Sequence, residues 1–134
     1  MTSENRRVHI EAELARGREA LRAAEALLAA GLLNDAVSRA YYAALHHALA
    51  LLLTEGVEPR THAGTSQMLG RHFVMTGKLS PERAKDLSRL EQFRGEADYN
   101  RFFVFTEPSA ADEVQVARRF CASVAELLES ATLA

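Results

Sequence analysis

Apolar residues recur along most of the chain with the three- and four-residue spacing of amphipathic helices. The stripe of the first segment consists of Ile10, Leu14, Gly17, Leu21, Ala24 and Leu28. Gly17 marks a place on this stripe where another backbone can come close, and Gly31 is placed to end the helix. No stretch shows the alternation of apolar and polar residues that is typical of a half-buried strand. The pattern therefore predicts an all-α protein.

The second segment runs from Asn34, a candidate N-cap, to Gly56. It is apolar almost all round, which is typical of a helix at the centre of a bundle. Its expected core face consists of Val37, Tyr41, Leu45, Ala48 and Leu52. The few polar residues of this helix therefore need an explanation.

Three further helices are expected after a break at Gly56 and Pro59. The third lies between Gly64 and Gly77, with Met68, Phe73, Val74 and Met75 as its apolar anchors. The fourth begins with Ser80 as N-cap and Pro81 at the first helical position, and it continues through Ala97. Ser109 is expected to cap the fifth helix, whose stripe is Val114, Ala117, Cys121, Val124 and Leu128. The expected architecture is a five-helix, mostly up-and-down antiparallel bundle.

Length and composition narrow the classes of protein further. The 134 residues fit a single domain over residues 1–134, and no linker or repeat divides them. The chain has 16 basic and 18 acidic residues, so its overall charge does not predict a nucleic-acid binder. A local basic patch is still compatible with this composition. Cys121 stands alone in an apolar helical pattern, so we expect a buried thiol. The charged N-terminus and the short apolar run Ala48–Leu53 predict a cytoplasmic protein without a membrane span.

Arg39, Tyr42 and His46 form a polar seam on the second helix, at positions i, i+3 and i+7. This spacing places them on one face, roughly opposite the core face. They are either structural residues that hydrogen-bond along a groove, or part of a site. In the second case Arg39 and Tyr42 are binding residues and His46 is a tentative catalytic residue.

The end of the fourth helix carries a second polar group in the sequence FRGEADYNRFF, residues 93–103. Arg94 continues the stripe of Leu87 and Leu90, so it points at a packing surface and needs a partner. Asp98 lies one turn later and can pair with it. Asp98 and Asn100 are therefore candidate binding residues, and the alternative is a structural ion pair.

Other chemistry is not indicated by the sequence. The histidines never occur four residues apart on one helix, so no metal site is expected. There is no glycine-rich phosphate loop after a strand and no nucleophile motif, and we expect no cofactor. Aromatic residues make up only 7% of the chain, which argues against an extended stacking platform for single-stranded nucleic acid.

Three stretches in the right order nevertheless resemble one known family. They are SRAYYAALHHALALLL in the second helix, THAGTSQMLGRHFVMTGKLS across the third and RGEADYN in the fourth. Together they resemble the HEPN domain, in particular its small stand-alone prokaryotic branch, over nearly the whole chain. The resemblance implies a five-helix bundle that forms a homodimer. It also implies a minimal nucleotidyltransferase as the partner in a toxin–antitoxin pair, and RNA or a nucleotide as a ligand.

Many HEPN domains are metal-independent ribonucleases, and their motif is an arginine followed after four to six residues by a histidine. The histidine supplies a group that titrates near neutrality, and the arginine a fixed cation for the phosphate. In this sequence the arginine is Arg94, but Tyr99 stands after four residues, no histidine follows, and Gly95 replaces the usual polar neighbour. Tyrosine is a poor general base at neutral pH. In related pairs the partner attaches AMP to a tyrosine close to the motif, and Tyr99 is the tyrosine in the matching region.

Three hypotheses follow from this departure. In the first, the protein is a binding module whose Arg94, Asp98 and Tyr99 face a nucleotide, an RNA or the nucleotidyltransferase, with Tyr99 as the site of AMP attachment. In the second, it is a ribonuclease toxin in which His46 converges with Arg39 and Arg94 on one phosphate. In the third, Arg39 and Arg94 pair with Asp98 to fix helix packing and the register of the dimer, and the protein is a purely structural helical dimer module.

Overall fold

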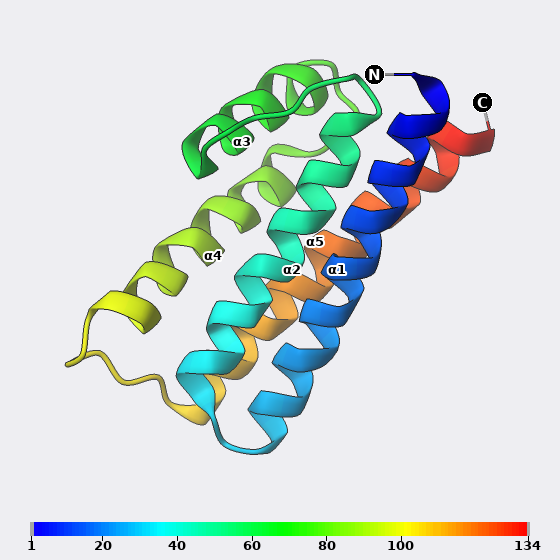
Figure 1. Cartoon of the computed structure of the whole chain (residues 1–134). Helices are drawn as coiled ribbons and strands as arrows, with labels where there is room; N and C mark the ends of the chain where they lie inside the picture. Colours follow the sequence, from blue (N-terminus) through cyan, green and yellow to red (C-terminus); the bar gives the residue numbers. More distant parts are fainter. Residues whose placement is uncertain (1, 134) are drawn as a thin grey trace.

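The computed structural model describes residues 2–133, with side chains to Ser130, and it confirms the all-α prediction. The helices are α1 (Ser3–Ala29), α2 (Leu33–Leu53), α3 (His62–Leu69), α4 (Pro81–Tyr99) and α5 (Glu107–Leu133). A π-helical turn, η1 (Gly70–Val74), extends α3. The four long helices run up and down beside one another, and α3 lies across the end of the bundle where α2 finishes (Figure 1).

The second helix is the centre of the bundle, as its apolar sequence predicted. α2 packs against α1, α4 and α5. All the residues of the expected core face, Val37, Tyr41, Leu45, Ala48 and Leu52, are buried. Because α2 is covered on three sides, its polar residues must meet neighbouring helices.

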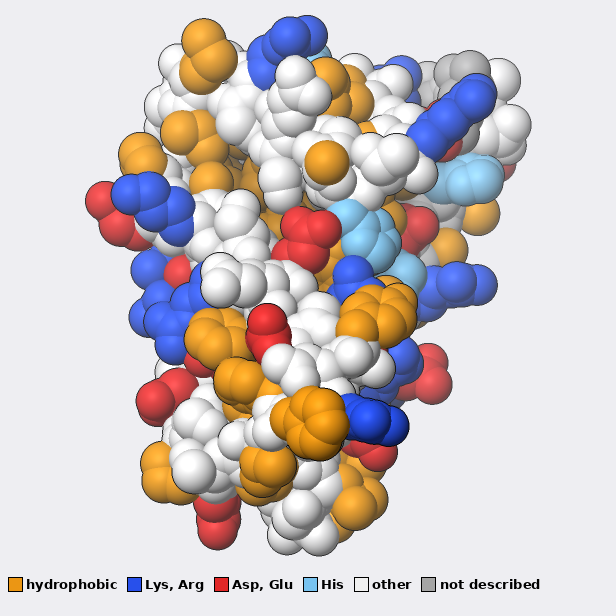
Figure 2. Space-filling model, turned by 90° about the vertical axis from the view of Figure 1, so that its left-hand side faces the viewer, with side chains coloured by type: hydrophobic (Ala, Val, Ile, Leu, Met, Phe, Trp, Pro, Cys, Tyr) orange, Lys and Arg blue, Asp and Glu red, His pale blue; other side chains and the backbone are white. Residues whose placement is uncertain are grey.

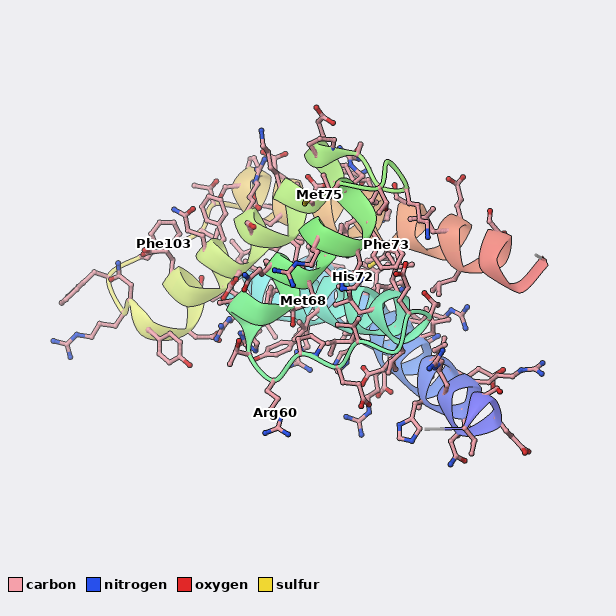
Figure 3. The ribbon with its side chains drawn as sticks, turned by 90° about the horizontal axis from the view of Figure 1, so that it is seen from above. Arg60, Met68, His72, Phe73, Met75 and Phe103 are labelled. Carbon is pink, nitrogen blue, oxygen red and sulfur yellow. The ribbon has the colours of Figure 1, made fainter. Side chains whose placement is uncertain are left out.

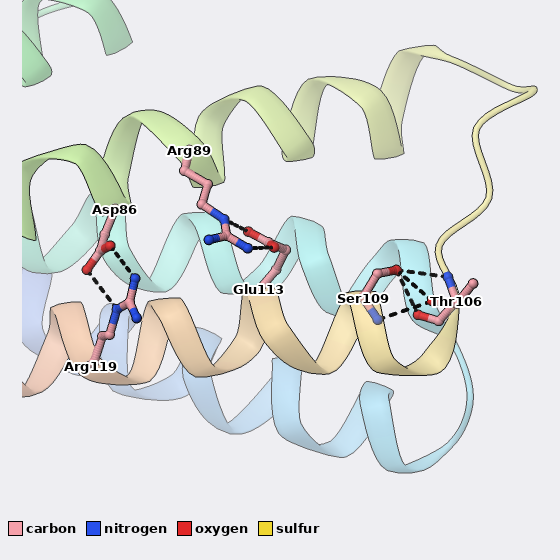
Figure 4. A network of polar contacts seen from close by, with 6 residues as sticks. All are labelled: Asp86, Arg89, Thr106, Ser109, Glu113 and Arg119. Carbon is pink, nitrogen blue, oxygen red and sulfur yellow. Dashed lines mark hydrogen bonds and ion pairs between the residues drawn. The ribbon is translucent and has the colours of Figure 1, made fainter. Parts of the chain in front are cut away.

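Most helix ends follow the sequence signals, with two corrections. Ser80 accepts a hydrogen bond from the backbone of Arg83 and caps α4, as expected. Asn34 is not the N-cap of α2, because the helix begins at Leu33 and the Asn34 side chain donates to the carbonyl oxygen of Ala97 instead. Ser109 lies inside the first turn of α5, where it and Thr106 bond to each other's backbone N–H in a reciprocal cap (Figure 4).

The third helix differs from its expected form because of the π-helical turn. Phe73 is buried, but Met75 is 82% exposed and is not an apolar anchor. Figure 3 labels both residues, seen from the end of the bundle that α3 covers. A π-helical turn holds more residues than an α-helical turn, so the stripe that includes Met68 does not continue to Met75.

Two ion pairs join α4 to α5, and in each an arginine holds one carboxylate with two hydrogen bonds (Figure 4). Arg89 donates to Glu113 at 2.9 and 2.6 Å, and Arg119 donates to Asp86 at 3.1 and 2.8 Å. Both carboxylate residues are buried. These pairs show how the bundle holds an arginine whose task is structural.

The helices α1 and α2 approach closely at Gly17, as the sequence predicted. A Cβ atom on Gly17 would lie 3.2 Å from the carbonyl oxygen of Ala43 and 2.7 Å from Cε1 of His47. The buried His47 therefore occupies the space that the missing side chain leaves, with Nδ1 2.8 Å from the Ala43 carbonyl oxygen. Cys121 is buried as expected, and burial raises the pKa of its thiol to about 12.

Candidate functional site

Arg94 lies on α4, and its side chain is only 12% exposed. The guanidinium carbon lies 5.1 Å from the ring centre of Tyr41 and 5.8 Å from the ring centre of Tyr99. Both distances are within the range of cation–π attraction. The Nε atom is buried without a hydrogen-bond partner in the described part of the chain. Aromatic rings therefore provide much of the environment of this cation.

The polar contacts of Arg94 are long. Nη1 lies 3.6 Å from a carboxylate oxygen of Asp98, and Nη2 lies 3.4 Å from Nδ1 of His62. Charge-assisted hydrogen bonds between arginine and carboxylate usually measure about 2.7–2.9 Å. The expected pair with Asp98 is thus confirmed, but it is much looser than the pairs made by Arg89 and Arg119.

Electrostatics keep Arg94 charged. Burial by itself lowers the pKa of the guanidinium, but Tyr42, Tyr99 and Tyr41 act in the opposite direction, and the net pKa is raised. The buried phenol of Tyr41 has a raised pKa, first because of burial and then because of Glu91. Arg94 is therefore a fixed cation at physiological pH, and it lies beside the neutral phenol of Tyr41.

His62 completes this group, and the sequence analysis did not single it out. The Thr61 side chain caps the start of α3, and the ring of His62, at the first helical position, lies 5.4 Å from the ring of Tyr41. Its Nδ1 is 3.9 Å from a carboxylate oxygen of Glu91, and its side chain is 40% exposed. Because 32 residues separate His62 from Arg94, helical periodicity gives no signal for their contact. The break at Pro59 followed by a capping threonine is the only local hint that His62 begins a helix.

Tyr99 and Asn100 end α4 in different ways. Tyr99 is 80% exposed and stands at the surface beside Arg94. Asn100 donates to Glu96 and accepts a hydrogen bond from the backbone of Phe102, so its side chain shapes the turn. Figure 2 shows this side of the molecule, where histidine and Lys or Arg side chains lie among hydrophobic ones. Tyr99 is thus accessible, while the side chain of Asn100 is already engaged.

The polar seam of α2 faces α1 and does not bring His46 to Arg94. Nδ1 of His46 lies 2.7 Å from a carboxylate oxygen of Glu13 on α1. Arg39 stacks on Tyr42, with its guanidinium carbon 4.9 Å from the ring centre, and makes no ion pair with Asp98 among the described residues. The hypothesis that Arg39, His46 and Arg94 share one phosphate needed a seam facing α4, and this geometry does not provide it.

The seam instead lines a groove of about 310 Å³ between α1 and α2. We name this hollow the α1–α2 groove; its lining is Arg16, Glu19, Ala20, Ala23, Arg39, Tyr42 and His46. Tyr42 connects it to the Arg94 site, because its ring packs edge-on against Tyr41, 5.3 Å away between ring centres. The residues predicted from the sequence therefore lie in two neighbouring groups, one around Arg94 and one in the α1–α2 groove, with Tyr41 and Tyr42 between them.

Another hollow, of about 730 Å³, lies between the start of α1 and the end of α5. Its polar lining includes Arg7 and Glu11, which pair with each other at 3.8 Å. Among the described residues, no group of three or more His, Cys, Asp or Glu side chains is arranged to hold a metal ion. Within the same part of the chain, no helix is both long and apolar enough to cross a membrane.

Comparison with known proteins agrees with this architecture. Residues 10–128 match the HEPN domain, and the chain belongs to the HEPN domain family. It is 40% identical over 93 residues to "Putative toxin MJ0605" of Methanocaldococcus jannaschii, a match that covers 69% of each chain. It is 47% identical over 76 residues to "UPF0332 protein PH1297" of Pyrococcus horikoshii, covering 55% of this chain and 54% of the relative.

A third relative, "Putative toxin MJ0142" of Methanocaldococcus jannaschii, is 31% identical over 91 residues, covering 68% of this chain and 62% of the relative. The matched regions thus span between about half and about two thirds of these relatives. The chain is a HEPN domain protein with relatives that are named as toxins.

Proposed function

We propose that this protein is the toxin-like member of a toxin–antitoxin pair, and that its Arg94 site binds a phosphate group of RNA or of a nucleotide. One observation carries the proposal. Arg94 is a mostly buried, permanently charged guanidinium that no carboxylate of the described residues holds at close range. Its Nε has no hydrogen-bond partner in the described part of the chain, and its contacts with His62 and Asp98 measure 3.4 and 3.6 Å.

The environment of Arg94 differs from that of the two arginines that form ion pairs between α4 and α5. In those pairs the guanidinium forms two short bonds to a buried carboxylate, which satisfies the acid. At Arg94 the rings of Tyr41 and Tyr99 contact the guanidinium, and its Nε has no hydrogen-bond partner among the described residues. An anion that enters this site gains charge-assisted hydrogen bonds without displacing a tight ion pair.

A binding experiment tests the proposal. Fluorescence anisotropy with a labelled single-stranded RNA compares the unchanged protein with Arg94→Gln and with the matched control Arg89→Gln, after both variants are shown to be folded. We expect Arg94→Gln to weaken binding about ten-fold or more, because a charge-assisted contact to phosphate is lost. We expect Arg89→Gln to bind as the unchanged protein does. Equal weakening by both variants would contradict a specific role for Arg94.

We further propose that the nucleotidyltransferase partner attaches AMP to Tyr99. The phenol oxygen of Tyr99 forms a bond to the α-phosphorus of ATP, pyrophosphate leaves, and the phenolic proton passes to solvent. Tyr99 is 80% exposed, whereas Tyr41 is fully buried. Arg94 lies within 5.8 Å of the Tyr99 ring, so it can pair with the phosphate once it is attached. The modification would then occupy the same guanidinium that binds RNA.

Mass spectrometry after incubation with a co-encoded nucleotidyltransferase, ATP and magnesium tests this step. The unchanged protein and Tyr42→Phe should gain AMP, and Tyr99→Phe should not. Modification of Tyr99→Phe to the same extent would place the acceptor elsewhere. Loss of RNA binding on modification is the expected functional consequence.

A second candidate function is cleavage of RNA, favoured by the contact between His62 and Arg94. Nδ1 of His62 lies 3.4 Å from the guanidinium, the ring is partly exposed, and an imidazole is a common general acid or base. In this function His62 replaces the absent histidine of the motif. The alternative predicted from the sequence gives this role to His46. Cleavage assays in EDTA separate them: His62→Ala and Arg94→Ala should abolish cleavage, and His46→Ala should leave it. Loss of cleavage in His46→Ala alone would reverse this assignment.

The family resemblance also implies a homodimer, which we include in the proposal. Multi-angle light scattering of the purified protein should then give twice the mass of one chain. A monomer at all concentrations tested would remove the homodimer from the account without affecting the binding of phosphate by Arg94.

A further inference from the structure

The α1–α2 groove is built from two matching helix faces. On α1 the lining residues Arg16, Ala20 and Ala23 follow at i, i+4 and i+7. On α2 the seam follows at i, i+3 and i+7. The alanines form the floor because their side chains are too short to fill the space between the helices. The longer polar side chains stand around this floor and leave a hollow of about 310 Å³.

The arginines of this groove have no carboxylate partner among the described residues. Arg39 lies over the Tyr42 ring, with its guanidinium carbon 4.9 Å from the ring centre, and it makes no ion pair among the described residues. Arg16 lines the opposite side of the hollow on α1. Arg89 and Arg119, in contrast, are clamped by buried acids. Two guanidinium groups are therefore available to one ligand.

His46 adds a third polar group to the groove, and Glu13 fixes its orientation. Its Nδ1 lies 2.7 Å from a carboxylate oxygen of Glu13, and a carboxylate in this position holds the proton on Nδ1. Nε2 is the ring nitrogen that remains for a ligand in the groove. Glu13 thus acts as a positioning residue that sets the tautomer and the plane of the ring.

We propose that the α1–α2 groove is a second binding site, separate from Arg94, for a single phosphate monoester group. Two guanidinium donors and Nε2 of His46, which accepts a hydrogen bond when the proton is on Nδ1, line one hollow from two helices. A phosphate monoester that carries one proton offers acceptor oxygens to the guanidinium groups and a P–OH donor to Nε2, whereas an ionised carboxylate offers no donor. The volume is at the lower end of the range for small-molecule sites, which suits one mononucleotide head group. Glu19 also lines the groove, and its negative charge disfavours a triphosphate.

Calorimetric titration with AMP, adenosine and ATP tests this site in the full-length protein. We expect AMP to bind at least ten-fold more tightly than adenosine, and ATP to bind no more tightly than AMP. Arg39→Gln and Arg16→Gln should each weaken AMP binding about ten-fold or more. The matched control Arg22→Gln, an exposed arginine of α1 outside the groove, should leave the affinity unchanged. Equal affinities for AMP and adenosine would overturn the proposal.

Arg94→Gln distinguishes the groove from the Arg94 site. If AMP binding survives in Arg94→Gln and is lost in Arg39→Gln, the groove is the site. If it is lost in Arg94→Gln and survives in Arg39→Gln, the groove proposal fails while the proposed function stands. A nitrogen NMR spectrum of the histidine rings tests the contact with His46 without replacing any residue of the groove. AMP should shift the Nε2 signal of His46 in the unchanged protein. Glu13→Gln should remove the preference for the proton on Nδ1. An unshifted Nε2 signal at saturating AMP would contradict the contact.

The phosphate can come from a free nucleotide or from the 5′ end of an RNA, and the same titration separates these sources. A short RNA with a 5′-phosphate is compared with the same RNA bearing a 5′-hydroxyl, both in the Arg94→Gln background. Tighter binding of the phosphorylated strand than of AMP identifies an RNA end as the ligand. Equal affinities for AMP and the phosphorylated strand identify the phosphate monoester itself.

Discussion

Replacing Arg94 by glutamine should remove function while it costs little stability. The contacts that would be lost are two cation–π contacts, a loose ion pair with Asp98 and a long contact with His62. Desolvated cation–π contacts contribute up to about 2 kcal/mol, and an i,i+4 pair about 0.3–0.5 kcal/mol. Removing the charge also relieves the burial of Nε, which has no partner among the described residues. The expected net loss in the free energy of unfolding is about 1 kcal/mol.

The matched change, Arg89→Gln, should cost more. It leaves the carboxylate of Glu113, whose side chain is only 3% exposed, without its two hydrogen bonds. Breaking a buried ion pair costs about 3–5 kcal/mol, and the 45% exposure of Arg89 places this pair at about 3 kcal/mol. The free energies of unfolding of the two variants are therefore expected to differ by about 2 kcal/mol. Arg89→Gln should be the less stable variant, although Arg94→Gln is the one that should bind RNA more weakly.

Urea denaturation at one protein concentration, followed by circular dichroism, measures this difference. With a urea dependence of about 2 kcal/mol per molar, the Arg89→Gln midpoint should lie about 1 M below that of Arg94→Gln. If Arg94→Gln is destabilised as much as Arg89→Gln or more, Arg94 is an architectural residue. The reasoning that assigns it to a site would then be wrong, and the structural hypothesis would be correct.

Three further predictions concern the packing of the bundle. Gly17→Ala should destabilise the protein by about 1–3 kcal/mol, because the new methyl group meets His47. Gly95→Ala should stabilise it by up to about 1 kcal/mol, because its methyl group meets open space and alanine favours a helix. Thermal unfolding of both variants checks these opposite signs. Burial lowers the pKa of His47, so the unfolded state binds its proton more readily, and stability should fall as the pH drops below about 6.5; urea titrations at several pH values should show a smaller fall in His47→Gln. Because the pKa of Cys121 is raised to about 12, a thiol reagent at pH 8 should react with the protein only after unfolding, and rapid reaction of the native protein would contradict its burial.

Much of the fold could be predicted from the sequence because it depends on local signals. The apolar face of α2 and the Ser80 cap of α4 each depend on residues that lie within one or two helical turns of each other. The three residues with positive φ, Gly31, Gly56 and Gly77, all follow helix ends that glycine had marked. Met75 was misplaced because nothing in the periodicity announces the π-helical turn before it.

The site was only partly predictable, because its contacts join helices that are distant in sequence. Arg94, Asp98 and Tyr99 were found from their spacing on one helix and their resemblance to a family motif. His62 was missed because its contact with Arg94 depends on how α3 crosses the bundle. The neighbour of His46 could not be predicted, since a polar seam on one helix does not say which helix it will face. In the structure His46 faces α1, where it contacts Glu13.

The central claim is that a phosphate group contacts the guanidinium of Arg94, and NMR of the arginine side chains tests it most directly. The spectrum resolves the Nε–H groups, and single-stranded RNA is added to the folded protein. The account predicts that the Arg94 Nε–H signal shifts with RNA concentration, while the signal of Arg89, held by Glu113, stays in place. An Arg94 signal that does not move when the RNA is bound would contradict the account.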